Sequence, residues 1–179
     1  MSARSNLVQK MDWNALYADQ LPRVYNYFRY RVGDDAVAED LTTATFEKAW
    51  KARRRFRRDR AAFSTWLFTI ARNVAIDHFR RRRPTLSLET IEQQGNELFR
   101  SREASPEDAL AYADDLARLG VLLARLPPRE QELVALKYGA GLTNRSIAGM
   151  TGLSESNVGT ILHRVVQKLR ARWEVGEER

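Results

Sequence analysis

Apolar residues recur every three or four positions through most of this chain, and no segment shows the apolar–polar alternation of a half-buried β-strand. Helix-ending signals divide this pattern, with Gly33 after the first stretch, Pro84 after the third and Pro127-Pro128 in the second half. Short amphipathic helices bury their apolar stripes only against one another. The sequence therefore predicts an all-α fold of two small helical domains joined by a flexible linker.

The first domain is predicted over residues 10–84 as a bundle of three helices. The apolar spacing indicates helices over residues 12–31, from Asp34 to about Lys51, and from about Ser64 to Arg82. Pro22 is expected to break the first helix or to begin a fresh first turn. The cationic loop KARRRFRRDRAAF separates the second and third helices.

The second domain is predicted over residues 106–175, after a linker. Residues 85–105 are polar, acidic and weakly periodic, which is typical of a linker. The domain opens with the run SPED, in which an N-cap serine precedes a proline and two acids of a first helical turn. Pro127-Pro128 is expected to end this helix and to open another, which Gly139 and Gly141 terminate.

Charge is distributed unevenly along the chain. Thirty Lys and Arg residues, most of them Arg, outweigh 23 Asp and Glu residues and give a net charge of +7. Residues 1–84 carry +9, residues 85–115 carry −6 and residues 116–179 carry +4. Two basic blocks around an acidic segment predict two contacts with one polyanion, and arginine forks suit phosphate and base edges.

Several classes of protein are excluded or disfavoured by what the sequence lacks. The absence of cysteine excludes disulfides, thiolate metal sites and a cysteine nucleophile. No Ser/His/Asp set, phosphate-binding glycine loop or HExxH motif occurs, so we predict no catalytic residue, cofactor or metal. No apolar run is long enough to span a membrane and the N-terminus has no signal-peptide core, so we expect a cytoplasmic protein without membrane insertion.

The most specific local pattern is that of a helix-turn-helix over residues 144–164. This motif needs a small residue where its helices cross, a glycine in the turn and apolar residues on the inner face of the second helix. Those places are taken by Ala148, Gly152, Val158 and Ile161, with Thr143 and Ser154 as caps. The second helix is predicted to reach Trp173. A small bundle without a ligand is the alternative.

A stripe on the third helix of the first domain passes from aromatic to polar to cationic. Its members are Trp66, Ile70, Asn73, Asp77 and Arg80. An aromatic ring beside hydrogen-bonding groups and cations suits the capture of unpaired bases, although the same residues could belong to the core. Arginines 53–55, 57, 58, 60 and 80–83 are interpreted as a phosphate track rather than a solvated face.

The acids Asp34, Asp35, Glu39 and Asp40 allow two interpretations. Carboxylates at helical spacing can chelate Mg²⁺. The favoured interpretation is simpler: helix N-terminal charges and a docking surface.

Three segments together resemble a bacterial RNA polymerase sigma factor of the extracytoplasmic-function group. They are LYADQLPRVYNYFRYRVGDDAVAEDLTTATFEKAW, FSTWLFTIARNVAIDHFRRRR and LARLPPREQELVALKYGAGLTNRSIAGMTGLSESNVGTILHRVVQKLR. The resemblance implies a sigma factor that binds core polymerase and directs promoter recognition, melting and initiation. Residues 10–84 are similar to the sigma-2 domain and residues 110–173 to the sigma-4 domain.

The resemblance also implies roles for individual residues. The partners it implies are core polymerase, through the β′ clamp helices and the β flap, double- and single-stranded promoter DNA, and an anti-sigma factor. The polymerase-docking residues would be Glu39, Asp40, Phe46 and Trp50. The downstream promoter residues would be Arg57, Arg58, Phe63, Ser64, Trp66, Asn73, Asp77, Arg80 and Arg81. The upstream promoter residues would be Ser154, Ser156, Asn157, Thr160, His163 and Arg164. In this family the linker threads the polymerase channel towards the RNA path.

Three positions depart from the usual pattern of the family. Ser146 stands where glutamate is common, and Gly159 and Ile161 stand where the recognition helix often carries lysine and arginine. Fewer cations there bear on the strength of upstream contacts. Two alternatives stay open from the residues themselves: a free-standing helix-turn-helix regulator that binds duplex DNA without polymerase, and an adaptor whose basic helices bind an acidic protein.

Overall fold

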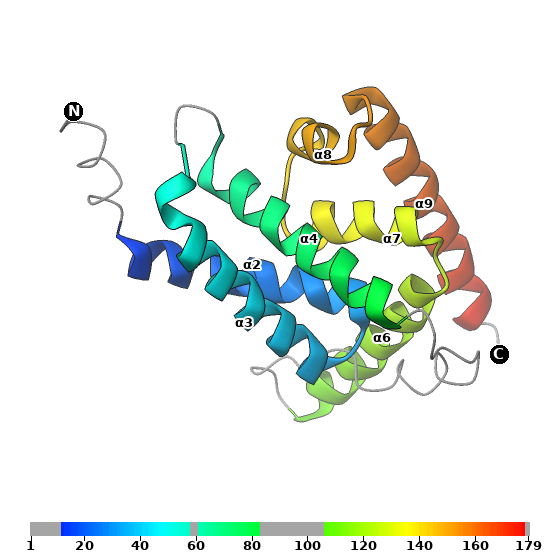
Figure 1. Cartoon of the computed structure of the whole chain (residues 1–179). Helices are drawn as coiled ribbons and strands as arrows, with labels where there is room; N and C mark the ends of the chain where they lie inside the picture. The colour runs from blue at the N-terminus through cyan, green and yellow to red at the C-terminus, as the bar shows by residue number, and fades with distance from the viewer. Residues whose placement is uncertain (1–11, 58–60, 83–105, 178–179) are drawn as a thin grey trace, which may run out of the picture.

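The structure, a computed structural model, describes residues 12–57, 61–82 and 106–177. Every regular element in these ranges is a helix, which confirms the predicted all-α class. Helices α2, α3 and α4 lie together in one half of the molecule, and α7, α8 and α9 form the other half (Figure 1). The predicted linker lies outside the described residues.

Helix α2 spans Trp13–Val32 and has strong signals at both ends. The carboxylate of Asp12 accepts hydrogen bonds from the backbone N–H groups of Asn14 and Ala15, at 3.0 and 3.1 Å. Gly33 ends the helix in the left-handed region, at φ 72°, which glycine adopts without strain. The predicted break at Pro22 is wrong, because the helix continues through this proline. Tertiary packing of α2 outweighs the one backbone hydrogen bond that proline cannot make.

Helices α3 and α4 complete the first bundle, at the positions that the sequence predicts. Helix α3 spans Asp35–Ala52, is followed by a short 3₁₀ turn at Arg53–Arg55, and is capped by Asp34 through the Val37 N–H at 2.8 Å. Helix α4 spans Phe63–Arg82. The three helices enclose a core of fully buried residues, among them Val24, Phe28, Ala38, Leu67, Phe68 and Ala71.

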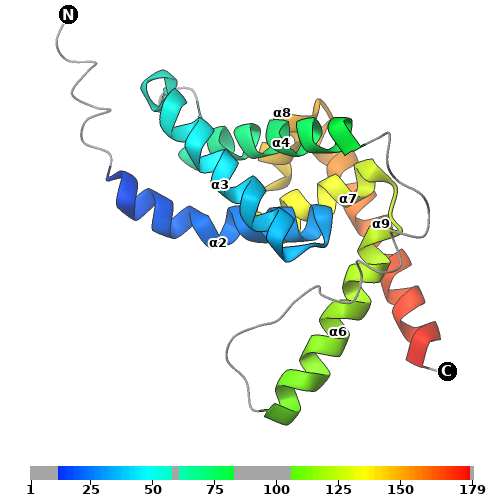
Figure 2. The ribbon, with the colours of Figure 1, turned by 60° about the horizontal axis from the view of Figure 1, so that its bottom comes forward.

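The second half contains five helical elements. Helix α6 spans Pro106–Ala124 and extends away from the α2–α4 bundle (Figure 2). Helix α7, Pro128–Val134, runs directly into a π-helical turn, η3, at Ala135–Gly139. Helix α8 spans Asn144–Thr151 and α9 spans Glu155–Glu177. Helix boundaries therefore lie where the sequence predicts them, at Pro127-Pro128 and at Gly139 and Gly141.

The two halves share one continuous core rather than two separate ones. Leu133, Leu136, Ile147, Val158 and Val165 are fully buried in the second half, and they form a single cluster with the buried residues of the first. Helix α2 packs along η3, which makes the largest contact between the halves. Each buried Leu or Ile side chain contributes about 1.5–3 kcal/mol relative to an exposed one, and the part of this burial that lies between α2 and η3 holds the halves together.

Candidate nucleic-acid and partner interfaces

The acids at the start of α3 divide into two structural and two exposed ones. Asp34 caps the helix, and Asp35 accepts a hydrogen bond from the Tyr25 hydroxyl at 2.8 Å and pairs with Arg29. Burial raises the pKa of the Tyr25 hydroxyl and lowers that of the Arg29 guanidinium. Glu39 and Asp40 remain exposed. Within the described part of the chain, no three His, Asp or Glu side chains gather as metal ligands would.

Three of the four predicted docking residues lie on one line along α3. At about 100° per residue, positions 39, 46 and 50 fall within about 20° of this line, and Asp40 lies about 100° round the helix from Glu39, also on its exposed side. The Trp50 ring is 51% exposed. The Phe46 ring is half-buried, because it packs on Tyr17 of α2 with ring centroids 4.5 Å apart. The stripe thus presents two carboxylates at one end and a tryptophan at the other.

Trp50 belongs to a cluster of aromatic rings that joins the two predicted sites of the first bundle. Trp13 contacts Trp50, Phe63 and Trp66 edge-on, with ring centroids 5.6, 5.5 and 6.5 Å apart. Phe56 is buried beneath Phe63 and Trp66, at 5.5 and 5.2 Å. Sequence reasoning missed Trp13, because these tryptophans lie on three different helices and no spacing along the chain connects them.

The polar stripe of α4 is accessible at its centre and bonded at its end. Trp66 and Ile70 are half-buried, and Asn73 is exposed. Asp77 pairs with Arg80 at 3.0 Å and with Lys48 of α3 at 3.7 Å. The stripe is therefore part core and part surface.

The other predicted downstream residues lie around this stripe. Phe63 and Ser64 are half-buried, and Arg57 and Arg81 are exposed. Arg58 lies outside the described residues.

The helix-turn-helix has the local geometry that its sequence predicts. The Thr143 hydroxyl accepts a hydrogen bond from the Ser146 N–H at 3.2 Å and so caps α8. Gly152 ends α8 in the left-handed region, at φ 73°. Val158 is fully buried and Ile161 is half-buried against the core. The inner face of α9 is therefore the predicted one, and α9 continues four residues past Trp173, to Glu177.

All six predicted upstream residues are exposed, Ser154 directly before α9 and the other five on the outer face of this helix. They are Ser154, Ser156, Asn157, Thr160, His163 and Arg164. Two of their hydroxyl groups already bond the backbone. Ser154 accepts from the Asn157 N–H at 3.2 Å, and Thr160 donates to the Ser156 carbonyl at 3.0 Å. The side-chain amide of Asn157, in the first turn, makes no hydrogen bond within the described ranges.

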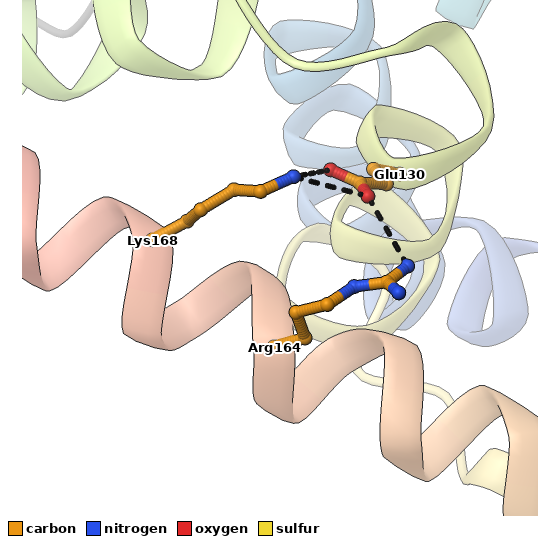
Figure 3. A network of polar contacts seen from close by, with 3 residues as sticks. All are labelled: Glu130, Arg164 and Lys168. Atoms are coloured by element: carbon orange, nitrogen blue, oxygen red, sulfur yellow. Dashed lines mark hydrogen bonds and ion pairs between the residues drawn. The ribbon is translucent and has the colours of Figure 1, made fainter.

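Glu130 of α7 holds two cations of α9 (Figure 3). Its carboxylate lies 3.4 Å from an Nη of Arg164 and 3.1 Å from the Nζ of Lys168. Glu130 is 8% exposed, whereas the Arg164 side chain is 62% exposed. Sequence reasoning missed this contact, which partly neutralises the guanidinium of a predicted DNA-binding residue.

Comparison with known proteins identifies the family. Residues 16–85 match Sigma-70 region 2, and residues 116–169 match Sigma-70, region 4. The chain is 38% identical over 155 residues to the ECF RNA polymerase sigma factor BldN of Streptomyces coelicolor, covering 86% of this chain and 57% of BldN. It is 32% identical over 160 residues to the RNA polymerase sigma factor CarQ of Myxococcus xanthus, covering 87% and 85%. The chain belongs to the extracytoplasmic-function (ECF) sigma factors of the sigma-70 family.

A solved structure agrees with this fold. The sigma factor RpoE in complex with the anti-sigma factor NepR, from Bartonella quintana, superposes with a TM-score of 0.69 at 20% identity, covering 92% of this chain and 98% of that chain. As an ECF sigma factor, the protein directs RNA polymerase to promoters, and the family is not enzymatic. None of the helices in the described ranges is long and apolar enough to cross a membrane.

The three departures from the usual ECF pattern have structural counterparts. The Ser146 hydroxyl lies 3.0 Å from that of Thr143, within the cap of α8. A Cβ on Gly159 would lie 3.4 Å from the side-chain nitrogen of Asn144, an ordinary van der Waals contact. Ile161 packs against the core. Ser146 therefore belongs to the cap of α8 and Ile161 to the packing of α9.

Proposed function

We propose that this ECF sigma factor docks on the β′ clamp helices of core polymerase through α3. The observation that carries the proposal is the stripe of Glu39, Asp40, Phe46 and Trp50, which presents two exposed carboxylates and a half-exposed indole along one side of the helix. Exposed charges steer association, and a large aromatic ring supplies a contact that excludes water.

We further propose that residues 10–84 open the promoter and hold its downstream element. The support is the position of Trp66 and Phe63 in an aromatic cluster, next to the exposed Asn73 and the arginines at the end of α4. Unpaired bases stack on aromatic rings, while cationic side chains contact the phosphates of the nucleic-acid backbone. Arg57, Arg58, Ser64, Asp77, Arg80 and Arg81 complete the proposed contact region.

The upstream element is assigned to residues 106–175. The six exposed residues on and directly before α9 form a polar face on the second helix of a helix-turn-helix, which is the helix that enters the major groove in this motif. We assign the β flap as a further polymerase contact of this domain. The proposal also includes an anti-sigma factor, supported by the similar fold of RpoE in complex with NepR, and a cytoplasmic location beside polymerase.

The charge reversal Asp40→Arg tests the docking proposal. It places a cation where an acid is proposed to meet the polymerase, so we expect co-purification with core polymerase and run-off transcription to be lost. Asp115→Arg, at an exposed acid of α6, is the matched control and should leave both intact. Normal assembly of a folded Asp40→Arg protein would place the docking surface elsewhere.

A further inference from the structure

Region 2 contacts region 4 through three arginines that lie along the boundary between α2 and α4. Arg23 of α2 donates two hydrogen bonds to the Ala140 carbonyl, from Nε at 2.9 Å and from an Nη at 2.6 Å. Arg31, two turns further along α2, donates to the Pro128 carbonyl at 3.1 Å. Both acceptors belong to region 4, at opposite ends of the α7–η3 segment.

The third arginine lies on α4 and pairs with a carboxylate. The Nε of Arg72 lies 2.8 Å from an Oε of Glu132 of α7. The side chains are 26% and 13% exposed, so this ion pair is screened less by water and salt than a surface pair.

The three guanidinium groups lie in one row. Arg23 stacks on Phe68 of α4 at 5.7 Å, and Arg31 stacks on Phe79 at 4.7 Å. Arg72 lies between those two phenylalanines on the same helix face, because positions 68, 72 and 79 are separated by one and two turns. Eight residues of α2 place Arg23 and Arg31 about 12 Å apart along its axis.

Region 4 satisfies this row only in part. Three of the four acceptors in region 4 are neutral carbonyl groups, those of Pro128, Ala140 and Gly141, and the Nε of Arg31 is buried without an acceptor among the described residues. A buried guanidinium without a full set of acceptors costs free energy. At Arg23 and Arg31, an anionic oxygen would therefore be a stronger acceptor than the carbonyl groups of region 4.

We propose that this row of Arg23, Arg31 and Arg72 is a second binding site for the nucleic-acid backbone, covered by region 4 in the closed protein. DNA phosphates would replace the three carbonyl groups and the Glu132 carboxylate when the two regions separate. Phosphate is the same type of acceptor with a full negative charge, and it forms stronger bonds with arginine. The inference rests on the proposed function of α4, which also carries Trp66 and Asn73.

The substitution Glu132→Gln tests the proposal on the full chain without polymerase. It removes the charge that holds Arg72 and keeps the shape of the side chain. Binding to a labelled single-stranded oligodeoxynucleotide of mixed sequence should strengthen roughly threefold or more at low salt. The slope of log K against log salt should steepen by about 0.7, the value for one more phosphate contact.

Two variants separate this effect from a general change in charge. In an Arg72→Gln background, Glu132→Gln should have no effect on the slope, because the released cation is then absent. Asp115→Asn removes an acid at an exposed position of α6, away from the row and from the proposed reading face, and it should leave the slope unchanged. Equal strengthening by Glu132→Gln with and without Arg72, or equal strengthening by Asp115→Asn, would overturn the proposal.

A competitor distinguishes nucleic acid from an acidic protein. Poly-glutamate at equal charge concentration should displace the oligodeoxynucleotide less well than unlabelled DNA does. If it competes equally, the row binds acidic protein and the proposal falls. The docking proposal fails separately, since it is measured by co-purification of Asp40→Arg with polymerase.

Discussion

The junction between α2 and η3 and the outer face of α9 are built in opposite ways. At the junction, Tyr27 is fully buried and Gly139 lies directly against the backbone of α2. On and directly before α9, all six proposed reading residues are exposed, and only Arg164 bonds another helix, through Glu130 of α7. The junction therefore packs region 4 closely against region 2 in this closed form, while α9 keeps its polar face available.

This difference indicates where substitutions act. A change at the junction should alter stability and the arrangement of the two regions, because its contacts are close-packed and buried. A change on the face of α9 should alter DNA preference and leave the fold intact, because exposed side chains contribute little to packing.

The largest expected effect is that of Gly139→Val. A Cβ at this position would lie 3.0 Å from the Asn26 carbonyl oxygen and from the Tyr27 Cα, both backbone atoms that cannot move aside cheaply. We expect the free energy of unfolding to fall by about 3 kcal/mol, the upper part of the usual range for overpacking. Denaturant titration measures this change.

Gly149→Ala is the matched control. Nothing lies within 4 Å of a Cβ at this position in α8, so alanine should stabilise the protein by about 0.5–1 kcal/mol through its higher helix propensity. Equal tolerance of both substitutions would mean that α2 and η3 do not pack closely in solution.

The second prediction concerns alkaline pH. Burial raises the pKa of Tyr27 to about 12 from 10.0. Below pH 10 the folded and unfolded states both hold this proton, so the ionisation of Tyr27 does not change the free energy of unfolding. Between pH 10 and pH 12 the unfolded chain ionises first, and the folded state loses up to roughly 3 kcal/mol of stability.

Tyr27→Phe should remove this part of the alkaline destabilisation. Unfolding free energies at near-neutral and alkaline pH, compared between wild type and Tyr27→Phe, measure the difference. Tyr138→Phe, whose ring is 51% exposed, is the control for loss of a tyrosine. An identical pH profile for Tyr27→Phe and wild type would show that the junction admits water.

The smallest effect on the fold is expected from Asn157→Ala. Its amide can pair with the N6 and N7 edge of adenine, so we expect a loss of about 1–3 kcal/mol of preference for one upstream base and no change in unfolding. Arg164→Ala is the comparison. It should weaken binding to all promoters alike. The salt dependence of binding should fall by less than the value for one phosphate contact, because Glu130 already neutralises part of the Arg164 charge. A promoter-library selection in which Arg164→Ala alone changes base preference would reverse the two roles.

The features that the sequence predicts well are local ones. Gly33 and Thr143 act at helix ends as predicted because each bonds groups within four residues. The helix-turn-helix is predictable for the same reason, since Gly152 and Val158 have roles fixed by neighbouring turns.

The features that the sequence does not predict depend on distant partners. Arg23 and Ala140 are 117 residues apart, and Arg72 and Glu132 are 60 apart. No periodicity connects such pairs, and an arginine-rich chain offers many alternatives. The continuous passage of α2 through Pro22 has the same cause, because packing from other helices offsets a local signal.

The distance between the two regions tests the central claim most directly. The chain has no cysteine, so Ala36→Cys on α3 and Gln167→Cys on α9, both exposed, give one labelled pair for fluorescence energy transfer. We predict efficient transfer in the free protein and a marked fall when core polymerase and promoter DNA are added, with Asp40→Arg keeping the high value. Low transfer in the free protein, or transfer that polymerase and promoter leave unchanged, would contradict the claim that regions 2 and 4 pack together in the free protein and separate on the promoter.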